Sequence, residues 1–367
     1  FNNRNELQRP EISMNYRDDN WYVRASSGYV IRTLESEDAL RDFTFDNNFE
    51  AVEVSTYVSY KFNDKTRVSS GYNLRNRAPS VSQLSPFVDV SDPLNIQQGN
   101  PNLKPSNNHS VYMNFNNYDF QSRSGFYSYI NFDATNDNVV PQTTVDENFV
   151  RTTTFTNVDG VYRVNGNVNY SKTKKLDTIR SIRLSGGIGV NANRNINFNN
   201  ETQYASRTIS YSPTINVSFI WEDLFEIRPS YRPSFSRNSF DIDAFEDRNY
   251  TRHQFTLRTK TTFPKNLEWN NDINFINNPD VAQGFQQNAV FWNSTVAYSF
   301  LQDKAIATLK VYDLLNQNTN AQRTSTAAYI EDVQSTVLQQ YFLISFSYKF
   351  NTLGKKGETR DGGFFFD

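Results

Sequence analysis

Hydrophobic and polar residues alternate along most of this chain with a period of two. Successive side chains of a β-strand point to opposite faces, so each alternating segment predicts a strand with one apolar and one polar face. In segment 209–219 one face would carry Ile, Tyr, Pro, Ile, Val and Phe, and the other Ser, Ser, Thr, Asn and Ser. The same pattern recurs in segments 162–170, 225–236 and 342–350.

The length of these segments favours a membrane over a soluble sandwich. Clean segments run for about 9 to 12 residues, which is roughly what a tilted strand needs to cross a bilayer. Strands of soluble proteins are usually nearer 5 or 6 residues. The longest apolar stretch, Tyr341 to Phe346, is too short to cross a membrane as a helix. Residues 35–41 are the only weak helix candidate, and we place them in a loop.

Short and long connections alternate between the predicted strands. The short polar turns are 18–20, 63–65, 174–177, 222–223, 264–266 and 302–304. The longer, irregular connections are residues 34–46, 78–106, 194–204, 239–249, 281–286 and 318–334. Because outer-membrane barrels have short periplasmic turns and long extracellular loops, this alternation sets the direction of every strand, and the last strand runs towards the periplasm.

Aromatic residues close the strands that enter the short turns. Such a row is expected of an interfacial girdle, where amphipathic rings lie at the headgroup level. The alternative is that they are strand-end aromatics of a soluble core, which their regular repetition argues against. The residues are Phe62, Trp221, Phe263, Phe300 and Phe350.

These features predict an all-β fold, a transmembrane antiparallel β-barrel over residues 1–351 with a periplasmic tail over residues 352–367. We expect the tail's closing Phe364 to Phe366 to dock on a periplasmic partner or the barrel rim. The pattern indicates about 15 strands, whereas bacterial single-chain barrels have an even number. Because the chain begins at Phe1 and shows no signal peptide, we expect the native start and further strands upstream.

Three prolines fit the strand pattern poorly. Pro213, Pro229 and Pro233 lie inside predicted strands, although proline cannot donate to a ladder and is usually kept to edges or bulges. We therefore expect bulges or strand ends at these positions.

Composition removes several classes of function. A mean hydropathy of −0.68 would suggest a soluble protein, but a strand that shows lipid only at every second residue keeps the average low. The 30 Phe, 21 Tyr and 4 Trp residues are the better indicator. A net charge of −2 leaves no basic excess for nucleic acid. Without cysteine there is no disulfide framework and no thiolate metal site.

No catalytic constellation, cofactor motif or metal site stands out, so we expect a protein that is not an enzyme. The two histidines, His109 and His253, fall in different strands, and we interpret them as partly exposed or lumenal rather than as a metal pair. Gly186, Gly187 and Gly189 lie in an alternating strand, which favours close strand contact or a bulge over nucleotide binding.

Two sets of residues are candidates for contact with other molecules. Inward-facing arginines would either pack against a plug, which we favour, or line a solvated substrate path; examples are Arg163, Arg183, Arg228 and Arg232. The longest loop carries aromatic and amide groups that would bind glycans, peptides or siderophores, unless the loop merely folds back over the barrel mouth. Its residues are Phe87, Asp89, Asp92, Asn95, Gln97 and Gln98.

Three stretches, in order and spacing, resemble TonB-dependent outer-membrane receptors. Arg77-Ala78-Pro79-Ser80, Leu84, Pro86 and Gly99 to Pro105 resemble an R-x-P-S element that closes one strand and a GNP-x-L-K-P-E element that leads into the next, with Ser106 in place of the usual Glu. Ala307 to Asn316 is similar to the signature of the penultimate strand, and Tyr341 to Phe350 to the terminal strand.

The resemblance implies a 22-stranded barrel in the bacterial outer membrane, filled by a plug domain that no pattern in this chain suggests. It implies TonB-dependent uptake of a scarce nutrient such as a glycan, peptide or metal chelate. The expected partners are the lipid bilayer, TonB through a region upstream of this chain, and a surface lipoprotein or other outer-membrane subunits. The alternatives are a structural subunit of a secretion or barrel-assembly complex, a passive porin and a soluble adhesin.

Overall fold

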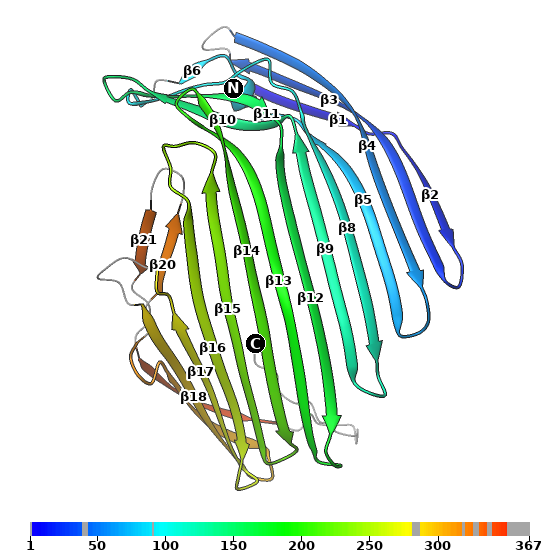
Figure 1. The fold of residues 1–367 in the computed structure, drawn as a ribbon, viewed down its shortest axis with the longest axis vertical. Coiled ribbons are helices and arrows are strands. Elements are labelled where there is room, and N and C mark those ends of the chain that lie inside the picture. The colour runs from blue at the N-terminus through cyan, green and yellow to red at the C-terminus, as the bar shows by residue number, and fades with distance from the viewer. Residues whose placement is uncertain are drawn as a thin grey trace.

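Most of the chain forms one long antiparallel sheet (Figure 1). The computed structural model describes residues 2–38, 43–89, 92–280, 287–317, 320–325, 330–335 and 340–350. Among these, the sheet path is β1-β3-β4-β5-β8-β9-β12-β13-β14-β15-β16-β17-β18-β19-β22, and β2 also pairs with β3. β1 and β2 lie one after the other along the same side of β3, separated by Arg9 and Pro10. The prediction of about 15 strands is therefore confirmed.

The bounds of the main-sheet strands are β1 Asn2–Gln8, β2 Glu11–Arg17, β3 Trp21–Asp38, β4 Phe43–Lys61, β5 Thr66–Arg77, β8 Ser106–Asp119, β9 Ser124–Asn136, β12 Val161–Lys175, β13 Arg180–Asn199, β14 Thr202–Trp221, β15 Phe225–Phe240, β16 Arg248–Thr262, β17 Leu267–Asn277, β18 Asn288–Phe300, β19 Ala305–Tyr312 and β22 Tyr341–Tyr348. The other elements are α1 Val81–Leu84, β6 Val88–Asp89, β7 Asn95–Gln98, β10 Asn138–Val145, β11 Arg151–Val158, β20 Asn320–Ser325 and β21 Ile330–Ser335.

Short turns gather at one edge of the sheet, at the bottom of Figure 1, as the sequence predicts. Two of the predicted long connections are wrong. In place of the predicted connection 34–46, β3 continues to Asp38 and β4 begins at Phe43. The weak helix predicted at residues 35–41 is therefore a strand over its described part. In place of the predicted connection 194–204, Asn200 and Glu201 alone join β13 to β14. The Asn-rich composition of 194–204 resembles a loop, but cross-strand bonds such as Asn197 Nδ2 to Ser206 Oγ, 3.0 Å, hold it as a ladder.

The prolines cause neither bulges nor strand ends, contrary to expectation. The register between β14 and β15 stays constant from Ser206 opposite Phe240 to Trp221 opposite Phe225, and pairs are absent only around the prolines. Each proline removes a donor locally, and the flanking pairs keep the strands in register. The glycine prediction is confirmed as close contact, because a Cβ at Gly187 would lie 2.5 Å from the Val168 carbonyl oxygen.

The register gives the sheet one apolar and one polar face. On the apolar face Tyr211 lies opposite Phe235, with ring centroids 5.0 Å apart, and Ile215 is 61% exposed. On the polar face amides link neighbouring strands: Ser230 donates to Asn216 Oδ1 at 2.6 Å, and Asn216 Nδ2 donates to Ser185 at 3.3 Å. The abundant Asn residues thus form hydrogen bonds across the polar face without adding charge.

A second, small sheet lies at the edge with the long connections (Figure 1). Its order is β10-β11-β7-β6, and it joins the loop after β5 to the hairpin after β9. Leu84 of α1 is fully buried with Leu34 and Leu103, and Phe49 packs against them. Leu34 and Phe49 lie on the polar face of β3 and β4 by register, so α1 and the small sheet contact that face there. Val140 and Val158 of the hairpin pack instead against Ile196 and Ala205, on the opposite face of β13 and β14.

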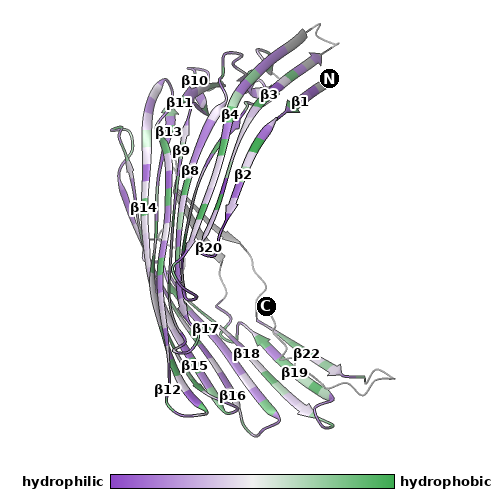
Figure 2. Cartoon of the chain, turned by 90° about the vertical axis from the view of Figure 1, so that its right-hand side faces the viewer, coloured by the Kyte–Doolittle hydropathy of each residue, from purple (hydrophilic) through white to green (hydrophobic). Residues whose placement is uncertain are grey.

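The main sheet curves into an open trough (Figure 2). Within the described residues its edge strands, β1 and β2 at one side and β22 at the other, do not pair with each other. The expected closed cylinder of 22 strands therefore stays a prediction, as does the absence of a plug. The predicted tail, residues 352–367, and its Phe triplet lie outside the described residues, and residues 318–319 and 326–329 of the predicted last long connection do so as well.

Candidate functional site: an arginine-lined pocket on the polar face

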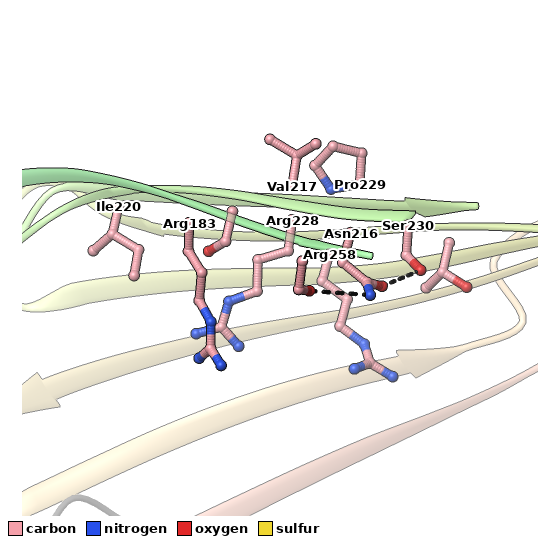
Figure 3. A pocket seen from close by; sticks show the side chains of 11 residues that line it. Arg183, Asn216, Val217, Ile220, Arg228, Pro229, Ser230 and Arg258 are labelled. Carbon is pink, nitrogen blue, oxygen red and sulfur yellow. Dashed lines mark hydrogen bonds between the residues drawn. The ribbon is translucent and has the colours of Figure 1, made fainter. Parts of the chain in front are cut away.

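A pocket of about 360 Å³ on the polar face of β13 to β16 gathers three arginines. Figure 3 shows the guanidinium groups of Arg183, Arg228 and Arg258 on one side of the strands, and Val217 and Pro229 on the other. The period of the strands explains this arrangement, since Arg228 and Pro229 are neighbours in sequence and must point to opposite faces. Asn216 and Ser230 lie between the arginines, and the Ser230 hydroxyl donates a hydrogen bond to the Asn216 side chain.

The register of β15 and β16 concentrates positive charge in this pocket. Arg228 lies directly opposite Arg258, and like charges in this position destabilise a strand pair. Two carboxylates offset part of the repulsion: Arg228 Nε donates to Glu226 at 2.5 Å, and Arg258 Nε donates to Asp272 at 3.0 Å.

Arg183 forms no ion pair with any described residue, so a positive charge is left over for an occupant. Guanidinium forks match carboxylate and phosphate groups, so the pocket suits an anion.

The arginines predicted from the sequence all lie on the polar face. Arg163 is opposite Asn193, and Arg232 is opposite Gln254. The structure brings only Arg183 and Arg228 together and leaves Arg163 and Arg232 outside the pocket. Sequence reasoning missed Arg258: the alternation within β16 indicates its face, but its position opposite Arg228 depends on the register between the two strands.

Both histidines are partly exposed, which is one of the two alternatives we expect, and they lie on the apolar face rather than on the polar one. Each accepts or donates a hydrogen bond at Nδ1 with a tyrosine hydroxyl of the neighbouring strand: His109 with Tyr72 at 2.9 Å, and His253 with Tyr231 at 2.8 Å. β8 and β16 lie far apart in the sheet order. The described residues contain no group of three or more His, Asp or Glu side chains that could hold a metal ion.

The candidate loop residues serve partly as structure. Asp92 accepts hydrogen bonds from Leu94 N at 3.0 Å and Asn95 Nδ2 at 2.7 Å, which shapes the turn before β7. Gln98 Nε2 donates to the Pro86 carbonyl at 3.3 Å. Phe87 is half-buried, and Gln97 is exposed. These contacts favour the interpretation that the loop folds back over the polar face.

The stretch that resembles TonB-dependent receptors builds the junction between the two sheets. Ser80 caps α1 and forms a capping box with Gln83. A Cβ at Gly99 would lie 2.3 Å from the Ser85 carbonyl oxygen, so only glycine lets this turn close on the helix. Asn100 Nδ2 donates to the Phe155 carbonyl at 2.9 Å, which ties the turn to β11.

Three of the predicted girdle residues adjoin the short turns and are exposed, whereas Phe300 is half-buried. Phe62, Trp221 and Phe263 have exposed fractions of 57%, 37% and 71%, and Arg180 lies 5.5 Å from the centre of the Trp221 ring. No helix among the described residues is both long and apolar enough to span a membrane. A sheet of long strands with an exposed apolar face, a polar face and an aromatic edge defines the class of β-barrel membrane proteins.

Comparison with known proteins names the family. The sequence profile of the outer membrane protein β-barrel family matches residues 32–348. The chain therefore belongs to this family and resides in the bacterial outer membrane. Accordingly the apolar face contacts lipid, the polar face lines the lumen, and the long connections lie outside the cell.

The search of curated proteins found no match. Among solved structures the chain is similar to the crystal structure of the Pseudomonas putida toluene transporter TodX, with a TM-score of 0.26 and 9% sequence identity. The alignment covers 95% of this chain and 89% of that chain. At this TM-score the likeness carries no argument about fold or substrate.

Proposed function

We propose that this chain is the barrel portion of a TonB-dependent receptor that takes up a scarce nutrient through a plugged lumen. The observation that carries the proposal is the surplus of positive charge on the lumenal wall at Arg183, Arg228 and Arg258. A polar interior is required of any such barrel, but Arg183 adds a third guanidinium group beside the opposed pair Arg228 and Arg258, whose two carboxylates are already engaged, so an anionic neighbour would be favoured there. Carboxylates of a plug domain, supplied by chain outside residues 1–367, would satisfy them.

The extracellular sheet supports the same proposal. A barrel that transports a scarce nutrient needs a binding surface at its outer mouth, and binding residues are commonly held on loops by a rigid scaffold. The small sheet is such a scaffold, because Leu84 packs against Leu34 of the main sheet and the Asn100 side chain ties the turn before β8 to β11. We propose a glycan, peptide or metal chelate as the nutrient and a surface lipoprotein as a further partner.

The second candidate is a structural subunit of a larger outer-membrane complex. The exposed apolar tip of the small sheet favours it: Phe149 is 83% exposed and Leu94 is 58% exposed. Purification of the native complex in mild detergent tests this candidate, since a stable stoichiometric assembly would support it. Loss of growth on one nutrient after gene deletion would support the receptor instead.

The lumenal charge is tested by substitution in the full-length gene. Replacing Arg183, Arg228 and Arg258 by Gln leaves Glu226 and Asp272 without their partners and changes the charge of this wall from +1 to −2, so it would repel an anionic neighbour. We expect uptake-dependent growth to fall while the protein still assembles, as shown by heat-modifiable migration on a gel. Arg123→Gln, in the turn between β8 and β9, is the matched control. Unchanged growth of the triple variant on every nutrient that requires the gene contradicts the proposed role of this wall.

A further inference from the structure

A belt of arginines lies on the lipid-facing side, outside the aromatic pair formed by Tyr211 and Phe235. Two residues further towards the extracellular edge, Arg237 lies opposite Ile209. Two residues beyond Ile209 on the same face of β14, Arg207 lies opposite Arg194 of β13. Three adjacent strands thus each contribute one guanidinium group to this belt, which we define as Arg194, Arg207 and Arg237.

The charge of this belt is only partly neutralised. Arg237 pairs with Asp247 at 2.9 Å, and Arg207 lies 3.9 Å from Asp241. Arg194 has no carboxylate partner in the described part of the chain and donates to the Gly160 carbonyl at 2.7 Å. Because Arg194 and Arg207 oppose each other directly, they repel unless an anion lies between them.

The backbone makes room for this arrangement. Gly160 has a φ of +82°, a backbone conformation that residues with a Cβ rarely adopt, and a Cβ there would lie 2.3 Å from Arg194 Nη1. The face just above the belt is closed, since Ile196 and Ala205 are buried against Val140 and Val158 of the hairpin. The belt lies directly below this buried cluster, and the side chains of Arg207 and Arg237 are 46% and 64% exposed.

The height of the belt matches lipid headgroups. Aromatic side chains of membrane barrels lie at the interface, and each strand residue adds about 3.4 Å along the strand. Residues two and four positions beyond the aromatic pair thus lie roughly 7 to 14 Å further out along the strand. An apolar band followed by arginines is the order in which a lipid presents its chains and then its phosphates.

We propose that Arg194, Arg207 and Arg237 bind the phosphate groups of an anionic lipid in the outer leaflet. Guanidinium groups bind phosphate oxygens in a bidentate manner. The neighbouring Ile209, Tyr211 and Phe235 contact the acyl chains of the same molecule. This inference rests on the outer-membrane location and the register, and it is independent of the proposed transport.

The test uses the full-length protein purified in non-ionic detergent, with bis-phosphorylated lipid A as the probe and native mass spectrometry as the readout. We expect the wild type to retain lipid A and to bind the enzymatically dephosphorylated lipid much more weakly. A basic residue near an anionic surface contributes roughly a fivefold factor in affinity. The triple variant R194Q/R207Q/R237Q should therefore bind lipid A about ten- to a hundredfold more weakly.

Matched variants separate the belt from general effects of charge and folding. Lys172→Gln with Lys174→Gln changes the same face at the periplasmic end and should leave binding unchanged. Asp247→Asn frees Arg237 while keeping an oxygen to accept from the Phe240 amide, so it should tighten binding, which loss of structure would not do. Heat-modifiable migration confirms that each variant is folded.

Two outcomes would overturn the proposal. One is equal binding of phosphorylated and dephosphorylated lipid, which would indicate contact through acyl chains alone. The other is displacement of lipid A by millimolar inorganic phosphate with the phosphate itself retained, which would indicate a site for the free anion.

Discussion

A buried carboxylate, that of Glu53, is held in the main sheet by the positive and hydrogen-bonding groups around it. Glu53 on the lumenal face of β4 is 7% exposed and accepts from Arg75 Nη1 at 2.7 Å and from the Asn76 amide at 3.1 Å. Arg9, between β1 and β2, also lies 3.3 Å from it. One buried carboxylate thus joins the edge strands to β4 and β5.

The substitution Glu53→Ala is expected to destabilise the folded protein. It removes the acceptor for Arg75 and the Asn76 backbone amide and the ion pair with Arg9, and a hydrogen bond to a charged group contributes about 1.5 to 3 kcal/mol, with the lower end applying to these partly exposed partners. Urea unfolding of the full-length protein in detergent micelles measures the loss. Glu50→Ala, on the opposite face, should change stability less, and equal losses would contradict the assigned role.

The periplasmic turn at Asp177 predicts a dependence of stability on pH. Arg180 Nε donates to its carboxylate at 2.6 Å and the Ile179 amide at 3.0 Å, and these bonds hold the pKa of Asp177 below its ordinary value of 3.8. A depressed folded-state pKa stabilises the fold above the unfolded pKa, and this contribution is lost as the pH falls through the folded value.

We therefore expect Asp177→Asn to lower the thermal stability at pH 7, and we expect this difference to shrink as the pH falls through the depressed pKa of the wild-type carboxylate. Heat-modifiable migration across that pH range measures both proteins. A difference between them that stays constant with pH would contradict the assignment.

At the scale of elements, alternation predicted strands well where lipid imposes it, and less well beyond the membrane. Segment 209–219 shows the pattern and lies inside β14. The polar composition of residues 34–46 and 194–204 predicts loops, whereas long-range pairing extends β3, β4, β13 and β14 through their described parts. The partner of a strand outside the bilayer depends on contacts distant in sequence, such as Ile196 with Val140.

Leu84→Ala is expected to loosen the small extracellular sheet without unfolding the barrel. Leu84 is 0% exposed, and truncating a buried leucine costs about 2 to 5 kcal/mol. That cost falls on the contact between α1 and the main sheet. Limited proteolysis of intact protein should cleave residues 85–105 and 137–160 faster, whereas Leu94→Ala at an exposed site should not. Equal protection of both variants would contradict the anchoring role.

At the scale of the whole molecule, the two faces decide how the chain lies in the membrane. The sequence predicted them, together with Arg183 and Arg228 of the pocket. It could not predict that Arg258 joins them, nor that His109 and His253 face lipid, since both facts depend on the register between strands. Alternation fixes only the relative faces within one strand, and one residue of register shift would exchange them.

A pair of arginine substitutions at adjacent positions tests the assignment of faces directly. Ile215 faces lipid between the Trp221 edge and the Tyr211 and Phe235 pair, and Thr214 is its lumenal neighbour. An arginine in contact with the bilayer midplane costs about 2 to 4 kcal/mol, whereas lumenal positions tolerate charge. Ile215→Arg should therefore reduce the folded, heat-modifiable fraction in the outer membrane, and Thr214→Arg should leave it near the wild-type level. A larger loss for Thr214→Arg than for Ile215→Arg would mean that the chain crosses the membrane with its two faces exchanged. The two positions are adjacent in sequence, so only the face of the sheet differs between them.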